Sequence, residues 1–97
     1  MDNIFLPNQR IVILQGLEHA AGHELSNEML QRLLREYGHA RGIADVNEQI
    51  NWLEKRGFVR AKRLEESGLV IVRALRPGVE AARGLIRAEG IDPPLED

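Results

Sequence analysis

The segment DVNEQINWLEKRGFV changes from helical to extended periodicity within a few residues. Val46, Ile50 and Leu53 are spaced as one buried stripe of a helix, whereas the residues after the glycine alternate as in a strand. Glycine is favoured directly after a helix because it tolerates the left-handed backbone conformation that ends many helices. We therefore predict a helix over residues 43–56 that leads at once into a β-hairpin.

Two extended segments, FVRAKRL and LVIVRAL, flank the loop EESG and predict this hairpin. A short loop that ends in glycine suits a hairpin connection. In the second segment valines alternate with Ile71 and Arg73, as in a strand with one packed face and one wetter face. Pro77 is well placed as the first residue of a final helix over residues 77–89, since its missing amide proton is not needed there.

Two further helices are predicted in the first half of the chain. The apolar residues of NQRIVILQGLEHAA recur at helical spacing and predict a helix over residues 9–21. Ser26 is a suitable N-cap, with leucines placed around it as a hydrophobic staple, and predicts a helix over residues 27–37. The inward residues expected of that helix are Met29 or Leu30, Leu33, Leu34 and Tyr37. Two consecutive prolines predict an extended or mobile tail over residues 90–97.

Composition limits the class of protein. A chain of 97 residues, 43% of them hydrophobic, suits one α+β, mostly α domain over residues 1–97, with a core over about residues 9–89. The absence of cysteine excludes disulfides, thiolate zinc sites and cysteine nucleophiles. No stretch approaches the ~20 apolar residues of a membrane span, and the N-terminus lacks the features of a signal peptide. We therefore expect a cytoplasmic protein with no membrane partner.

Charge is distributed unevenly along the chain, although the net charge is only −2. Residues 1–54 carry four Lys/Arg and eight Asp/Glu, and residues 77–97 carry two and five, so both ends are acidic. Residues 55–76 carry seven Lys/Arg and two Asp/Glu, a net charge of +5 in the hairpin region. Such a hairpin can be a solvated surface that protects a sheet edge, or it can bind phosphates.

The order of three helices, a hairpin and a last helix resembles that of winged helix-turn-helix domains. The phrase INWLEKRGFV is similar to their usual join between recognition helix and wing. A narrower resemblance, to the small ArsR-like winged-helix proteins of Mu-like phages and prophages, rests on ELSNEMLQRLLREYGHARG, VNEQINWLEKRG and AARGLIRAEGIDPP. The ArsR-like label implies DNA binding controlled by a metal, although this chain lacks the cysteines that many such sensors use.

The resemblance implies a DNA interface made by the third helix and the wing. In such domains the third helix enters the major groove and the hairpin contacts the backbone or the minor groove. Asn51 would then pair with adenine, Glu48 with the cytosine amino group, and Lys55 with phosphate or guanine. Hairpin cations would contact phosphates, so that affinity falls steeply with salt. The candidate DNA-binding residues are Arg41, Asn47, Glu48, Asn51, Lys55, Arg60, Lys62, Arg63 and Arg73.

A protein-protein interaction adaptor, for instance in phage assembly, is the alternative function. Asp45 and Glu48 give the third helix an acidic side, which suits a docking surface better than a surface that approaches phosphates. The position of the cations separates the two hypotheses, because DNA binding requires the hairpin cations and the polar side of the helix on one common face.

A homodimer through the first or the last helix is also predicted. These helices carry more apolar surface than a small monomer easily hides, unless it is buried inside the same monomer. Gly84, expected within the last helix, would allow another helix to approach closely. The apolar residues concerned are Ile11, Val12, Ile13, Leu85 and Ile86.

No catalytic residue, metal ligand or cofactor is predicted. The chain has two serines, no threonine, no glycine-rich phosphate loop and no HExxH motif, so we expect no enzyme. His19 and His23 are four residues apart, but a glycine between them is expected to end the helix, which favours surface or capping roles. His39 is expected to hold a turn. Trp52, the only tryptophan, is expected to pack under the hairpin or against a partner chain.

Overall fold

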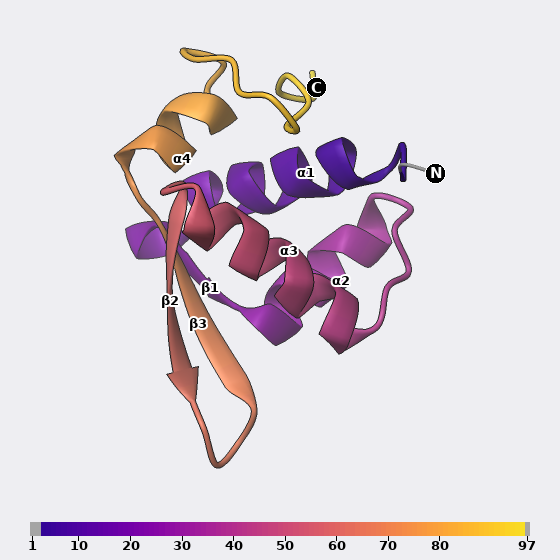
Figure 1. Cartoon of the computed structure of the whole chain (residues 1–97), viewed down its shortest axis with the longest axis vertical. Helices are drawn as coiled ribbons and strands as arrows, with labels where there is room; N and C mark the ends of the chain where they lie inside the picture. Colours follow the sequence, from indigo (N-terminus) through magenta and orange to yellow (C-terminus); the bar gives the residue numbers. More distant parts are fainter. Residues whose placement is uncertain (1–2, 97) are drawn as a thin grey trace.

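The computed structural model describes residues 3–96 and shows a helical body with a β-hairpin that projects from it (Figure 1). The elements in chain order are α1 (Leu6–His19), the 3-10 helix η1 (Ala21–His23), β1 (Glu24–Ser26), α2 (Asn27–Glu36), α3 (Ile43–Lys55), β2 (Val59–Leu64), β3 (Leu69–Ala74) and α4 (Arg76–Ala82). The predicted order of three helices, a hairpin and a last helix is confirmed. Within residues 3–96, none of the helices combines the length and the hydropathy needed to cross a membrane.

The sheet has three antiparallel strands in the order β1-β3-β2. The hairpin pairs Leu64 with Leu69 across its loop, and β1 pairs Leu25 with Val72 on the other side of β3. β1 was not predicted, because three residues are too few to show an alternating pattern. It fixes the base of the hairpin to the segment that leads into α2.

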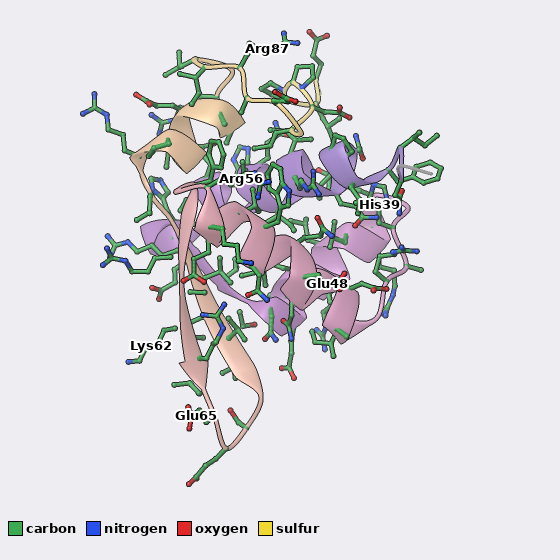
Figure 2. The ribbon with its side chains drawn as sticks, in the orientation of Figure 1. His39, Glu48, Arg56, Lys62, Glu65 and Arg87 are labelled. Atoms are coloured by element: carbon green, nitrogen blue, oxygen red, sulfur yellow. The ribbon has the colours of Figure 1, made fainter. Side chains whose placement is uncertain are left out.

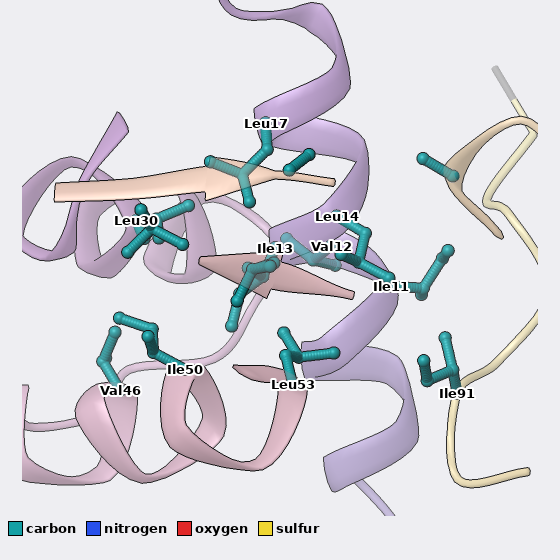
Figure 3. Packing of buried hydrophobic residues seen from close by; sticks show 14 of the residues in the cluster. Ile11, Val12, Ile13, Leu14, Leu17, Leu30, Val46, Ile50, Leu53 and Ile91 are labelled. Atoms are coloured by element: carbon teal, nitrogen blue, oxygen red, sulfur yellow. The ribbon is translucent and has the colours of Figure 1, made fainter. Parts of the chain in front are cut away.

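The hydrophobic core is built around α1, with α2, α3 and the sheet packed against it (Figure 3). The predicted stripe of Val46, Ile50 and Leu53 is confirmed, since all three side chains are buried. From α2, Leu30 and Leu34 are buried in the same cluster. These contacts set the direction in which the remaining side of α3 points.

Six consecutive residues of α1, from Gln9 to Leu14, are buried, and this decides one of the dimer predictions. Ile11, Val12 and Ile13 are each at most 2% exposed, so the core of the same chain uses them. They cannot also form an interface with a second copy. Leu85 and Ile86 are exposed, and a homodimer that uses them stays a prediction.

The N-terminus of α2 is capped as predicted. The hydroxyl of Ser26 accepts a hydrogen bond from the backbone N–H of Met29 at 3.1 Å. The inward position expected of Tyr37 is wrong, because α2 ends at Glu36 and the side chain of Tyr37 is 55% exposed. The chain turns away at this residue, which therefore lies beyond the packed face of the helix.

The last helix is shorter than predicted, and the apolar residues Leu85 and Ile86 lie beyond its end. α4 ends at Ala82 instead of residue 89, because Gly84 adopts the left-handed conformation with φ of 74°. Gly84 is therefore a helix terminator and not a site for close helix packing. Leu85 is 68% exposed and Ile86 is 37% exposed, so neither belongs to the core.

The residues after α4 have no regular structure but are held against α1 (Figure 1). Ile91 is 8% exposed, and the N–H of Asp92 donates to the carbonyl of Pro7 at 3.2 Å. The side chain of Gln15 accepts from the N–H of Leu95 at 3.1 Å. Of the predicted alternatives of an extended or a mobile tail, the structure shows residues 91–95 without regular structure and held by apolar burial and these hydrogen bonds. α1 begins at Leu6, where Pro7 suits the first turn, and ends at His19.

Candidate nucleic-acid interface

The side of α3 opposite to its buried stripe is exposed and polar. Glu48, Asn51 and Lys55 are all exposed on this side, as the helical spacing predicts. Figure 2 labels Glu48 on α3. Arg41, just before the helix, lies with its Nε 3.9 Å from the Oδ2 of Asp45, and the side chain of each is roughly half exposed. This Nε is buried and has no hydrogen-bond partner within residues 3–96.

Asn47 is half-buried and belongs to an internal hydrogen-bond network. The amide of the fully buried Asn27 donates to the Oδ1 of Asn47 at 3.0 Å and to the carbonyl of Gly68 at 3.4 Å. The Oδ1 of Asn27 accepts from the N–H of Val70 at 3.1 Å. Asn27 therefore joins α2, α3 and the base of the hairpin loop. This contact occupies the Oδ1 of Asn47, whose side-chain amide we expected to face the DNA bases.

The hairpin cations are divided between the two faces of the sheet. We call the inner face the one that packs on the core and on α3, to which Val59, Ala61 and Arg63 belong; Arg60 and Lys62 belong to the outer face. Side chains alternate between the faces along a strand. Figure 2 shows Lys62 pointing away from α3.

This division corrects the expectation of one common basic face. Arg73 lies directly opposite Arg60 in the sheet register, so it too belongs to the outer face. Of the four predicted hairpin cations, Arg63 is the one directed towards α3. The strand period of two separates residues that the segment charge of +5 had treated as one group.

Arg63 is bound to two side chains of α3. Its Nη2 donates to the Oε1 of Glu54 at 2.9 Å and also to the Oδ1 of Asn51. The other carboxylate oxygen of Glu54 accepts from the N–H of Ala61 at 3.1 Å, a backbone group on the free edge of β2. The hydrogen bond from Arg63 lowers the pKa of Glu54, and it outweighs the opposite effect of partial burial.

A cleft of about 260 Å³ lies between α3 and the hairpin. Its polar lining includes the amides of Asn47 and Asn51 and the guanidinium of Arg63, while Glu65 lines the end towards the hairpin loop. The lining is completed by Ile50, Leu64, Gly68, Leu69 and Val70. The tip of the wing is acidic, because Glu65 and Glu66 are both exposed in the hairpin loop. Figure 2 shows Glu65 near this end of the hairpin.

Trp52 lies between two guanidinium groups, so its predicted position under the hairpin is wrong. The central guanidinium carbons of Arg10 and Arg56 lie 3.7 Å and 3.8 Å from the centre of the ring. Arg10 is almost fully buried and donates to the side chain of Gln49 at 2.9 Å and to the carbonyl of Gly90 at 3.0 Å. The indole thus belongs to the side of α3 that meets α1 and the tail.

His39 has a side-chain hydrogen-bond partner in α1. The Nε2 of His39 lies 2.7 Å from the Oδ1 of Asn8, which joins the α2–α3 connection to α1, whereas the sequence predicted only a role in holding a turn. Within residues 3–96, no three His, Asp or Glu side chains converge on a position that could hold a metal ion.

Two solved structures share this arrangement of helices and sheet. AbsC, a MarR family transcriptional regulator from Streptomyces coelicolor, is 18% identical with a TM-score of 0.63, over 78% of this chain and 49% of AbsC. A mutant of ZitR from Lactococcus lactis in its apo form is 16% identical with a TM-score of 0.61, over 80% of this chain and 54% of ZitR. The fold is a winged helix. This chain spans about half the length of both proteins. No protein-family model and no curated sequence matches it.

Glu54→Gln is expected to destabilise the winged helix at neutral pH and to lose this effect in acid. The pKa of Glu54 is lower in the folded protein, so its contribution to stability is present above the pKa of the unfolded state, about 4.3, and is lost as the pH falls through the folded pKa. Urea unfolding of wild type and variant at neutral and acidic pH measures the difference. Glu48→Gln, on the exposed side of the same helix, is the control, and a pH-independent difference for Glu54→Gln would contradict the assignment.

Proposed function

We propose that this chain binds duplex DNA as a small transcriptional regulator or DNA-handling accessory of phage or prophage origin. The surface involved is the exposed side of α3 together with the adjoining cleft. The observation that carries the proposal is the position of Arg63, which is held by α3 at the cleft beside the exposed Asn51. The winged-helix fold, shared with a MarR family transcriptional regulator, supports this choice of surface.

Arg63 is oriented by its neighbours and keeps donors for a phosphate. Within residues 3–96 only its Nη2 is hydrogen-bonded, so Nε and Nη1 can donate to a phosphate oxygen without displacing Glu54. The side chain of Arg63 is 46% exposed, which keeps these donors accessible. Lys55, one turn beyond Asn51, adds a second cation to the same side of α3.

The proposed surface predicts weak salt dependence, because three of the four hairpin cations lie on the opposite face of the sheet. If Lys55 and Arg63 contact phosphates, the logarithm of affinity should fall against the logarithm of salt concentration with a slope of about −2 per chain. If all four predicted hairpin cations contributed, the slope would be about −4. The slope therefore distinguishes an interface on α3 from one that surrounds the whole wing.

Fluorescence anisotropy with a labelled random-sequence duplex tests the proposal. We expect the inner variant, Lys55→Gln with Arg63→Gln, to weaken binding about tenfold or more at low salt, because it removes both proposed phosphate contacts. The outer variant, Arg60→Gln with Lys62→Gln, changes the net charge equally in the same region and is expected to bind like wild type. Absence of binding by wild type at low salt, or equal losses in both variants, would reject DNA binding through α3.

A protein-binding adaptor is the second candidate function. The exposed carboxylates of Asp45 and Glu48, together with the acidic tip of the wing, oppose a close approach to phosphates. Three of the hairpin cations also lie on a different face from α3, a distribution that supports protein binding. Failure of the duplex to bind in the same titration would favour this function.

A further inference from the structure

The outer face of the wing is a second charged surface that the proposed DNA interface does not use. It comprises Arg60, Lys62 and Leu64 of β2, Leu69, Ile71 and Arg73 of β3, and Glu24 and Ser26 of β1. We propose that this face binds an extended polypeptide segment that presents acidic and aliphatic residues on one side. The inference is independent of DNA binding, because it concerns the opposite side of the hairpin.

The cations of the outer face have no ion-pair partner within residues 3–96. Arg60, Lys62 and Arg73 are all exposed, and none is within ion-pair distance of a carboxylate, whereas Arg63 on the inner face is paired. Arg60 is directly opposite Arg73 in the register, an arrangement of like charges that destabilises a sheet. Glu24, across from Arg73 on β1, is the sole carboxylate among the strand residues of this face. The net charge of the face is therefore +2, and an acidic partner would relieve the repulsion.

Aliphatic side chains separate these cations. Leu64 is exposed, and Leu69 and Ile71 are half-buried, so each keeps apolar area in contact with water. Ile71 is directly opposite Lys62, which places an apolar contact beside a charge. A partner gains most from this surface when it offers both carboxylates and apolar side chains.

The same pattern disfavours nucleic acid as the occupant. None of the strand residues on this face is aromatic, so single-stranded bases would have nothing to stack on. A phosphodiester backbone has no apolar groups that would match Leu64 and Ile71. A duplex that lies along α3 meets the inner face of the hairpin, while Lys62 points the other way (Figure 2). A polypeptide is thus the class of partner that this chemistry fits.

The strand spacing defines how the segment would lie. Arg60 and Lys62 are two residues apart, which places them about 6.6–6.8 Å apart along β2. Alternate residues of an extended peptide share one side and have the same spacing, so two carboxylates two residues apart can face these cations and an aliphatic residue two positions further can face Leu64. The free edge of β2 is not the site, because Glu54 already accepts the edge N–H of Ala61. The segment is expected to lie flat on the outer face, along β2, instead of adding a strand.

The test uses the full chain and a synthetic probe, a labelled short peptide with glutamates two residues apart, a valine two residues after the second glutamate, and small polar residues between them, so that glutamates and valine share one side when the peptide is extended. We expect the outer variant, Arg60→Gln with Lys62→Gln, to bind the probe about tenfold more weakly than wild type, since two exposed ion pairs are lost. The inner variant, Lys55→Gln with Arg63→Gln, has the same net charge and is expected to bind the probe like wild type. Amide chemical shifts should change on addition of the probe mainly at the outer-face residues of β2 and β3.

Two controls keep the result specific. A peptide with glutamine in place of glutamate should lose binding, and thermal unfolding should show that both variants are folded. No binding of the acidic probe to wild type, or an equal loss in the two variants, would overturn the proposal. A loss of duplex binding in the outer variant would also overturn it, because the face would then belong to the DNA interface. Loss of duplex binding in the inner variant alone tests the DNA proposal separately and leaves the peptide result unaffected.

Discussion

Gly78→Ala is expected to lower the free energy of unfolding by about 1–3 kcal/mol, as overpacking of a filled core does. A Cβ atom added at Gly78 would lie 2.2 Å from the carbonyl oxygen of Phe58 and 3.2 Å from its carbonyl carbon. That oxygen already accepts a hydrogen bond from the N–H of Leu75 at 3.0 Å. The backbone of Phe58 cannot move away without breaking this hydrogen bond, so α4 would have to move away from Phe58.

Gly16→Ala is the matched control for this prediction. A Cβ atom at Gly16 would also lie 2.2 Å from a neighbour, but the neighbour is Cδ2 of Leu33, the end of a flexible side chain. Alanine also gains roughly 0.5–1 kcal/mol over glycine within a helix. We therefore expect Gly16→Ala to leave the free energy of unfolding within about 1 kcal/mol of wild type. Urea unfolding measures both variants, and equal losses would show that the contact at Phe58 has no special effect.

Asn27→Ala is expected to lower the free energy of unfolding by about 1–3 kcal/mol, because it leaves the buried N–H of Val70 without a hydrogen-bond acceptor. The N–H of Val70 is bonded to the Oδ1 of Asn27, in a part of the sheet from which water is excluded. The carbonyl of Gly68 and the Oδ1 of Asn47 lose their donor as well. The loss should appear as a lower midpoint of urea unfolding.

Asn51→Ala is the control for the buried asparagine. Asn51 has the same side chain but is exposed, and we expect a change within about 0.5 kcal/mol. Amide hydrogen exchange adds a local measurement, because Asn27→Ala should speed exchange at Val70 more than at Leu53. Similar unfolding midpoints for the two variants would contradict the role given to Asn27.

Local patterns were sufficient to predict most of the fold. The stripe of Val46, Ile50 and Leu53, the cap at Ser26 and the hairpin loop all depend on residues close together in the chain, and all are confirmed. The length of the last helix was within reach of the same reasoning. Gly84 is a usual helix terminator, but the apolar Leu85 and Ile86 beyond it looked like a continuing helical face.

The distribution of the hairpin cations over the two faces of the sheet could also have been predicted from the sequence. Once Val59 is assigned to the core, alternation places Arg63 on its side and Arg60 and Lys62 on the other. Summing charge over the segment concealed this division. The predicted DNA-binding set therefore separates into residues near α3 and residues on the opposite face of the sheet.

Contacts between distant residues were outside the reach of the sequence pattern. Asn27 lies 43 residues from Val70, and Gln15 lies 80 residues from Leu95. An asparagine at the start of a helix is most simply explained by local capping, so nothing marked Asn27 as a link between three elements. The docked tail was missed for the same reason, because its partners lie at the other end of the chain.

The stacking of Arg10, Trp52 and Arg56 gives the molecule an intrinsic optical reporter. The emission of the single indole responds to charges beside its ring, and two guanidinium groups lie on its two faces. Displacement of the tail from Arg10, or recruitment of Arg56 by a bound polyanion, would change that emission without any added label. Ligand titrations and refolding experiments can therefore be followed by fluorescence in the wild-type chain.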